Sequence, residues 1–190
     1  MKGKAGVLEV ITGCTRSGKT DELIRRLRQV GYAHQKLQVF RSANDDPWIR
    51  SEAGPKFPAV VVRWAADIRG LVQPETQVVA IDCVQFFGNI IISVVDELVD
   101  RGLRVIVAGP DLDFRAEPFG SMPTLIAKAD KIDKLSAICM VCGEPASRSQ
   151  RLVDGKPAHY DDPFMFVGLS DVYEPRCRLH HEVVMEPREK

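Results

Sequence analysis

The stretch that decides the fold is VLEVITGCTRSGKT, residues 7–20. Its first half is apolar and has the length of a buried strand, and its second half fits the pattern GxxxxGK[ST] in full. The residues that follow place Leu23, Ile24 and Leu27 on one side of a helix. An accidental glycine turn is the alternative, but it does not account for a strand before the loop and a helix after it. The stretch therefore predicts a phosphate-binding loop.

The loop has the residue types that a chain of phosphates requires. Glycines let backbone N–H groups turn towards phosphate oxygens, and the start of a helix adds its partial positive charge. Lys19 can reach the outer phosphates, and Thr20 can bind Mg²⁺. The phosphate-binding residues that we assign are Gly13, Ser17, Gly18, Lys19 and Thr20.

Strands and helices alternate outward from this stretch, which is typical of a parallel sheet with helices on both faces. The expected strands are residues 37–40, 59–62, 77–82 and 104–108, and the expected helices are residues 21–30, 89–100 and 123–130. Residues 44–58 contain three prolines and are expected to form a mobile loop. Asp82 ends an apolar strand, where P-loop enzymes carry a residue that holds Mg²⁺. We therefore predict a P-loop NTPase-like α/β domain over residues 1–135.

The remaining residues, 136–190, are rich in turn residues and carry two pairs of metal ligands. One pair is a CxxC and the other a CxxH, and together they supply the four ligands of a tetrahedral zinc site. Four protein ligands leave no position open for chemistry, so the zinc is expected to be structural. His181 is an alternative to its neighbour. The expected ligands are Cys139, Cys142, Cys177 and His180.

Composition excludes several classes of partner. The chain has 190 residues, 45% of them hydrophobic, and its 26 Lys and Arg balance 26 Asp and Glu. This balance gives no general attraction to nucleic acid or to an anionic membrane. No apolar run has the length of a membrane span, and no hydrophobic signal region follows the basic first residues. We therefore expect a cytoplasmic protein that binds neither nucleic acid nor membrane, with its cysteines reduced.

These motifs together resemble one family, the small, zinc-containing, tetrameric thymidine kinases of bacteria and animal cytosol. The resemblance spans nearly the whole chain, and the matching stretches have the family's order and spacing. They are GCTRSGKTDELIRRLR (13–28), VVAIDCVQFF (78–87), VIVAGPDLDFRAEPFG (105–120), CMVCGEPASRSQRL (139–152), PAHYDDPFMFVG (157–168) and YEPRCRLHH (173–181).

The resemblance implies an enzyme that transfers the γ-phosphoryl group of ATP to the 5′-hydroxyl of thymidine. Lys19 and Thr20 would bind ATP and Mg²⁺, and Asp82 would hold the metal ion. A zinc-held lasso loop would close over the nucleoside. Without the resemblance, Phe86, Phe114 and Phe119 would be interpreted as core residues. The substrate-binding residues that it implies are Gln85, Phe86, Phe114, Phe119 and Tyr173. A homotetramer and feedback binding of thymidine triphosphate follow from the resemblance as well.

Three positions depart from the family at the phosphate site. The family has a glutamate after the metal-binding aspartate, as base towards the 5′-hydroxyl, whereas this chain has Cys83, whose thiol is mostly protonated at neutral pH. The family's arginine two residues after the aspartate at position 45 is Pro47 here. The family's Met-Phe in the glycine loop is Thr15-Arg16, which predicts an altered base pocket.

The departures leave alternatives open. Arg16, Arg50 and Arg115 are candidates for the missing cation, and the sequence does not choose among them. With Asp82 and Cys83 at the catalytic positions, the chain is a thymidine kinase, active or slow, or else a nucleotide-binding protein that senses thymidine or its triphosphate. A zinc-ribbon ATPase that acts on nucleic acid is disfavoured by the zero net charge. Cys14 and Cys83 are also candidates for a thiol pair near the phosphates, although two inert thiols are the simpler interpretation.

Overall fold

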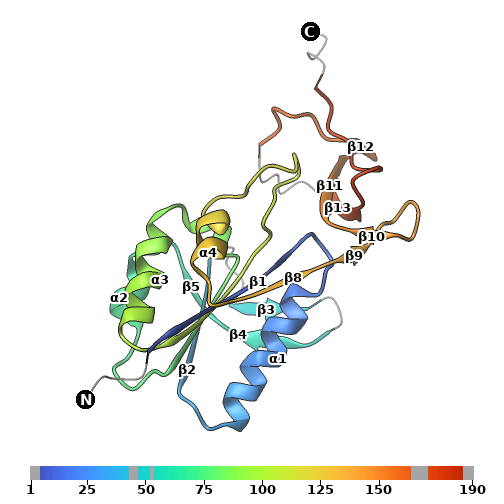
Figure 1. The fold of residues 1–190 in the computed structure, drawn as a ribbon. Coiled ribbons are helices and arrows are strands. Elements are labelled where there is room, and N and C mark those ends of the chain that lie inside the picture. The colour runs from blue at the N-terminus through green and yellow to red at the C-terminus, as the bar shows by residue number, and fades with distance from the viewer. Residues whose placement is uncertain (1–4, 43–46, 52–53, 164–170, 186–190) are drawn as a thin grey trace.

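A six-stranded parallel sheet forms the centre of the protein (Figure 1). The computed structural model describes residues 5–42, 47–51, 54–163 and 171–185. The order of the strands is β5-β2-β6-β7-β1-β8, and every neighbouring pair is parallel. The strands are β1 (Val7–Gly13), β2 (Leu37–Ser42), β5 (Val60–Val62), β6 (Val78–Asp82), β7 (Arg104–Ala108) and β8 (Lys131–Leu135). Their carboxyl ends meet at one edge, where α/β sheets bind ligands.

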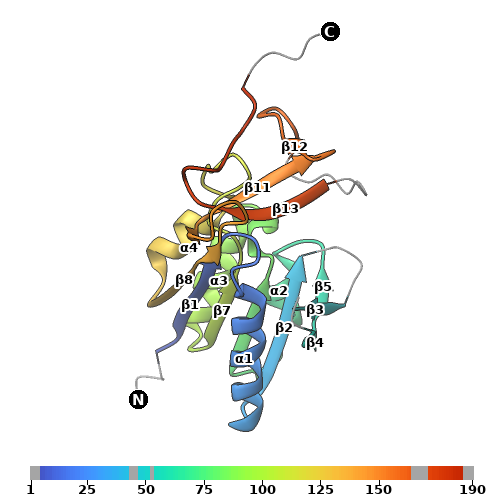
Figure 2. The same ribbon diagram turned by 90° about the vertical axis from the view of Figure 1, so that its right-hand side faces the viewer.

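Helices cover both faces of this sheet. Helix α1 (Lys19–Tyr32) lies on one face, and α2 (Asp67–Leu71), α3 (Ile90–Asp100) and α4 (Met122–Lys128) lie on the other (Figures 1 and 2). Successive residues of a strand point to opposite faces, so β6 contributes Val78 and Ala80 to the α1 core and Val79 and Ile81 to the α3 core. The predicted α/β class, with helices on both faces, is confirmed.

The chain beyond β8 forms a smaller unit of antiparallel strands. Strand β9 (Ala137–Ile138) pairs with β10 (Pro145–Ala146), and β11 (Arg148–Val153) lies between β12 (Lys156–Pro157) and β13 (Asp171–Arg176). The pairing of Gly13 with Leu135 puts the end of β8 beside the start of the glycine loop. This unit therefore begins next to the loop, beyond the carboxyl edge of the sheet (Figure 2).

The expected mobile loop over residues 44–58 is wrong in part. Within it, β3 (Trp48–Arg50) pairs antiparallel with β4 (Lys56–Pro58). Ile49 is completely buried and packs in the α1 core, which gives the hairpin a place on the domain. The prolines misled the interpretation because Pro47 and Pro55 lie just outside the strands. Residues 43–46 and 52–53 of the segment, Asp45 among them, lie outside the described residues.

Within residues 1–135, the sequence also missed three further elements. Strand β8 has the sequence KIDKL and none of its residues is buried, so it lacks the apolar pattern of a core strand. Helix α2 and the 3-10 helix η1 (Val84–Phe87) are too short for helical periodicity to appear. None of the helices in the described ranges is long and apolar enough to cross a membrane.

Candidate functional site

The glycine loop between β1 and α1 encloses a hollow of about 370 Å³. Gly18 has a φ of 84°, a conformation that favours glycine, and a Cβ on Gly13 would come within 2.2 Å of the Leu135 carbonyl oxygen. The Lys19 Nζ donates a hydrogen bond to the Cys14 carbonyl oxygen at 2.5 Å, within the loop itself. Burial lowers the pKa of this ammonium group. The residues that line the hollow are Thr15, Arg16, Ser17, Gly18, Lys19, Thr20, Asp21 and Arg50.

A second hollow, of about 240 Å³, adjoins the first. Lys19, Thr20 and Arg50 line both, so the two hollows meet at these three residues. The second hollow is lined in addition by Arg41, Trp48, Asp82, Cys83, Gly109 and Pro110. The glycine loop and the end of β6 thus face a shared space, as the sequence predicts for a P-loop domain.

Asp82 and Cys83 lie at the end of β6. Burial raises the pKa of the Asp82 carboxyl, and the nearby charge of Arg41 opposes this shift. The Cys83 Sγ donates a hydrogen bond to the Asp82 Oδ2 at 3.6 Å. Burial and the neighbouring carboxylate raise the pKa of the Cys83 thiol to about 12. Cys83 is therefore a neutral thiol at physiological pH, which cannot accept a proton as a carboxylate does.

Two of the aromatic residues assigned to the base pocket lie together. The rings of Phe86 and Phe119 meet edge to face with their centroids 5.5 Å apart. Gln85 directly precedes Phe86 in the chain, and its buried Oε1 accepts no hydrogen bond from any described residue. An orphaned acceptor of this kind fits a site that awaits a polar ligand.

The other two substrate residues lie towards the smaller unit. Phe114 is buried beneath the guanidinium groups of Arg115 and Arg151, which lie 4.8 Å and 5.3 Å from its ring centroid. Tyr173 is half-buried on β13, opposite Arg151 of β11. Residues 164–168 of the expected lasso loop lie outside the described residues.

The three candidate arginines occupy different places. Arg16 lines the first hollow alone, and Arg50 lines both hollows. Arg115 donates hydrogen bonds to the carbonyl oxygens of Tyr160 and Asp162, at 2.6 Å and 2.7 Å, so it holds the chain of the smaller unit. The sequence did not predict that the β3–β4 hairpin contributes Trp48 and Arg50 to the second hollow. The buried Ile49 between these two residues nevertheless has the alternation of a strand.

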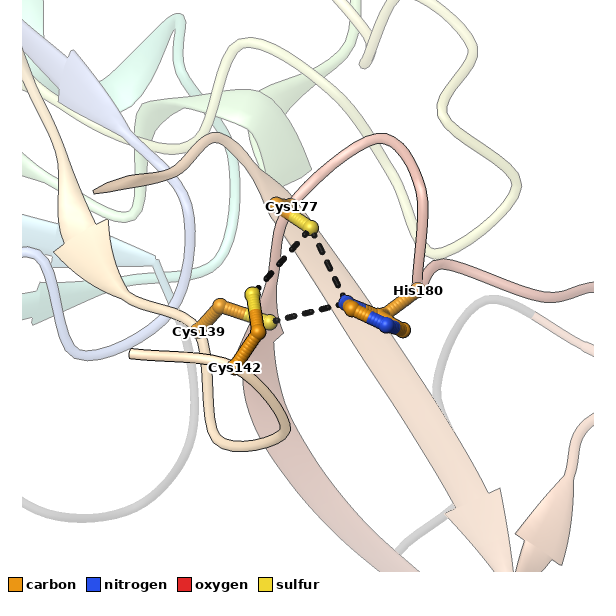
Figure 3. A group of neighbouring side chains, drawn as sticks. All are labelled: Cys139, Cys142, Cys177 and His180. Atoms are coloured by element: carbon orange, nitrogen blue, oxygen red, sulfur yellow. Dashed lines mark hydrogen bonds between the residues drawn. The ribbon is translucent and has the colours of Figure 1, made fainter. Parts of the chain in front are cut away.

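The four predicted metal ligands come together in one cluster (Figure 3). Their ligand atoms all lie within 4.8 Å of one another. The Cys142 and Cys177 sulfurs are 3.8 Å apart, and the His180 Nδ1 lies 3.9 Å from the Cys139 sulfur. Zinc–sulfur bonds of about 2.3 Å at tetrahedral angles place sulfurs about 3.8 Å apart, so the donor set fits zinc.

The structure separates the two adjacent histidines. The His181 Nε2 donates a hydrogen bond to the Phe114 carbonyl oxygen at 2.9 Å, away from the cluster, and His180 supplies the fourth ligand atom. His181 thus ties the segment after the cluster to the loop that carries Phe114.

Two contacts join the glycine loop to the smaller unit. The Thr15 backbone N–H donates to the Ser149 Oγ at 2.9 Å, and the Cys14 Sγ donates to the Ala146 carbonyl oxygen at 3.4 Å. Cys14 belongs to the same buried cluster as Cys139, one of the metal ligands. Burial raises the pKa of the Cys14 thiol. Both Cys14 and Cys83 are therefore neutral thiols at physiological pH, which supports the interpretation as two inert thiols.

A strand, a glycine loop with lysine and threonine, a helix and an acid-tipped parallel strand define a P-loop nucleotide-binding protein. A family model described as thymidine kinase matches residues 6–181. A curated relative, a thymidine kinase of Deinococcus deserti, is 50% identical over 192 residues, which cover 94% of this chain and 95% of the relative. The chain belongs to the thymidine kinase family and is a phosphotransferase.

Proposed function

We propose that the protein transfers the γ-phosphoryl group of ATP to the 5′-hydroxyl of thymidine. One observation carries this proposal: the hollow of the glycine loop and a second hollow at Asp82 share the lining residues Lys19, Thr20 and Arg50. A nucleotide in the first hollow would point its outer phosphate towards an acceptor in the second. Phosphoryl transfer depends mainly on this kind of positioning and on charge stabilisation.

Each assigned residue has a role in the proposal. Gly13, Ser17 and Gly18 form the cradle for the phosphates, and Lys19 neutralises the charge of the outer ones. Mg²⁺, when bound, neutralises charge on the phosphate oxygens, and the residues suited to hold it are Thr20 and Asp82. The nucleoside would be held by Gln85, Phe86, Phe114, Phe119 and Tyr173, and the exposed face of Phe86 supports contact with a base.

The zinc site has a structural role in the same proposal. Cys139, Cys142, Cys177 and His180 would fill all four positions of the ion, which leaves none for substrate or water. We place the boundary between the P-loop domain, residues 1–135, and the zinc-binding lasso subdomain, residues 136–190, at the turn from β8 into β9. The family resemblance further supports a cytoplasmic homotetramer with feedback binding of thymidine triphosphate.

Cys83 supports a second candidate, a nucleotide and nucleoside sensor with little or no transfer. A thiol whose pKa is raised to about 12 cannot act as the base, and loss of a general base costs about 10² to 10⁴ in rate. Transfer in this protein is accordingly expected to be slow. The nucleoside hydroxyl would lose its proton to water, or only after the bond to phosphorus has largely formed.

A turnover assay separates the two candidates. Purified protein with Mg²⁺ and ATP is expected to release ADP only when thymidine is added, with thymidine monophosphate formed in equal amount. Release of ADP without thymidine, or no release at any enzyme concentration, would contradict the kinase. In the second case, a rise in melting temperature with thymidine or its triphosphate would identify the sensor.

A further inference from the structure

We propose that Arg50 is a catalytic residue of this transfer, whose guanidinium binds the phosphoryl group as it passes from nucleotide to nucleoside. The inference rests on the proposed function and adds a residue from the β3–β4 hairpin to the site. It assigns to this chain a cation at the place where the developing charge of the reaction lies.

The first argument is the position of Arg50. The glycine-loop hollow and the Asp82 hollow have three lining residues in common, Lys19, Thr20 and Arg50. The first two begin helix α1 and belong to the phosphate loop, whereas Arg50 reaches the junction from β3. A group that moves from the first hollow to the second must cross this junction. Arg50 therefore faces the transferred group rather than the nucleotide or the acceptor alone.

The second argument is that the hairpin is held in place. Ile49 is buried in the α1 core, and because strand residues alternate, its neighbours Trp48 and Arg50 point the other way, towards the Asp82 hollow. The Ser51 hydroxyl donates to the Asp21 carboxylate in the first turn of α1. The Arg41 guanidinium donates to the Trp48 carbonyl oxygen. These contacts on both sides of Arg50 fix its backbone beside the glycine loop, as positioned catalytic groups require.

The third argument is the chemistry that the junction needs. The transition state of phosphoryl transfer spreads negative charge over three oxygens, and a planar guanidinium can bind two of them at once. Arg41 lines only the second hollow and Arg16 only the first, while Arg115 binds carbonyl oxygens of the smaller unit. Among the arginines of the described ranges that line these hollows, Arg50 alone lines both.

Two substitutions and a control test this inference. Arg50→Gln removes both the positive charge and the planar guanidinium that can bind two oxygens at once. Arg50→Lys keeps the positive charge but not the planar guanidinium. Arg63→Gln is the control, because Arg63 is an exposed arginine that lies against Trp64 and lines neither hollow. Arg50 is itself exposed, so Arg50→Gln is expected to keep the melting temperature of the wild type.

The readouts are turnover and the affinity for two nucleotides. Arg50→Gln is expected to lower kcat at least about tenfold, since an arginine on the transferred group contributes up to about 10³ to 10⁵ in rate, while the KM for thymidine stays within about twofold. Its affinity for a non-hydrolysable ATP analogue should fall about tenfold or more, whereas that for ADP, which lacks the γ-phosphate, should be unchanged. Arg50→Lys should give intermediate values and Arg63→Gln those of the wild type.

The outcomes separate this inference from the proposed function. Wild-type turnover with an unchanged kcat in Arg50→Gln would overturn the role of Arg50 and leave the kinase intact. If the wild type does not turn over thymidine, the proposed transfer fails, and the binding data decide on Arg50. A loss confined to the ATP analogue would then support contact with the γ-phosphate, and equal losses for both nucleotides, or none, would overturn it.

Discussion

The parallel sheet and the zinc-binding unit are stabilised in different ways. Strands β1, β6 and β7 are almost entirely buried and lie between two cores of aliphatic side chains. Three strands of the smaller unit, β9, β10 and β12, have only two residues each. Large apolar residues around its metal cluster remain in contact with water, as Leu179 does at 83% exposure. Burial of apolar surface is the main stabilising term for the sheet, whereas the smaller unit has too little of it to fold without another contribution.

This difference shows how a rigid phosphate site and a metal-binding unit can belong to one short chain. The sheet fixes the glycine loop and Asp82, and the smaller unit brings four side chains together in a cluster that fits one metal ion. The two regions touch where Cys14 and Thr15 meet Ala146 and Ser149. The predictions that follow separate the two regions or test this contact.

Removal of zinc is expected to have the largest effect. Structural zinc sites contribute about 10–16 kcal/mol in small domains, so a strong chelator or Cys142→Ser should unfold β9–β13. Hydrogen exchange should then show lost protection in residues 137–163 and 171–176, and retained protection in β1, β6 and β7. Metal analysis of protein purified without added zinc should find one zinc per chain.

The matched control is Cys83→Ser, since Cys83 lies outside the metal cluster. It should leave both zinc content and exchange unchanged. Normal protection of β9–β13 in protein shown to be free of metal would contradict a structural role of zinc.

The second prediction concerns the sheet's own site. Lys19→Ala should weaken ATP binding by a factor of about 100, because the lysine supplies the main charge towards the outer phosphates and hydrogen bonds to charged groups are the strong ones. Titration calorimetry with ATP measures the loss. Zinc content should not change, and ATP affinity equal to that of the wild type would show that the nucleotide binds elsewhere.

Both regions contain features that could be predicted from the sequence. Residues 7–20 and 77–82 combine buried strands with a motif of fixed geometry, so both the parallel sheet and the meeting of Lys19 with Asp82 could be expected. The three cysteine ligands could be expected from their spacing, and the fourth ligand as either His180 or His181. In each case the pattern is short and the geometry it requires is local.

The rest depended on contacts that no local pattern encodes. Strand β8 is polar because it lies at the edge of the sheet, and the hairpin at β3 is ordered by one buried side chain, Ile49, against α1. The hydrogen bond from the Cys14 thiol to the Ala146 carbonyl oxygen of the smaller unit could not be expected from the sequence either. Tertiary packing of this kind is visible only in three dimensions.

The third prediction restores the carboxylate at the end of β6. Cys83→Glu should raise thymidine phosphorylation at least about tenfold, because it replaces a neutral thiol with a proton acceptor and a general base contributes about 10² to 10⁴ in rate. The measurement is kcat with saturating ATP and thymidine. An ordinary kinase rate in the wild type without any gain in Cys83→Glu would mean that another group or a water molecule positions the hydroxyl.

Cys83→Ser is the control for this prediction as well. The Cys83 thiol has a pKa of about 12, so it stays protonated between about pH 6 and about pH 9, where an unperturbed thiol would begin to titrate. The rate profiles of wild type and Cys83→Ser should therefore have the same shape over this range. A rise towards pH 9 that is present only in the wild type would show that the thiolate takes part.

The last and smallest effect is expected at the contact between the two regions. Ser149 is buried on β11, and its hydroxyl accepts the hydrogen bond of the Thr15 backbone N–H within the glycine loop. Ser149→Ala removes this acceptor and frees the loop at one point, at a cost of about 0.5–1.5 kcal/mol for a neutral hydrogen bond. If that cost falls on the nucleotide-bound conformation, ATP affinity should drop by a factor of about 2–10, since 1.4 kcal/mol corresponds to tenfold.

Ser93→Ala, which alters an exposed serine on α3, is the matched control and should leave ATP affinity unchanged. Zinc content should be equal in both variants, so that a loss of affinity confined to Ser149→Ala reports on the contact itself. Unchanged affinity in Ser149→Ala would mean that the sheet and α1 hold the glycine loop without help from the zinc-binding unit.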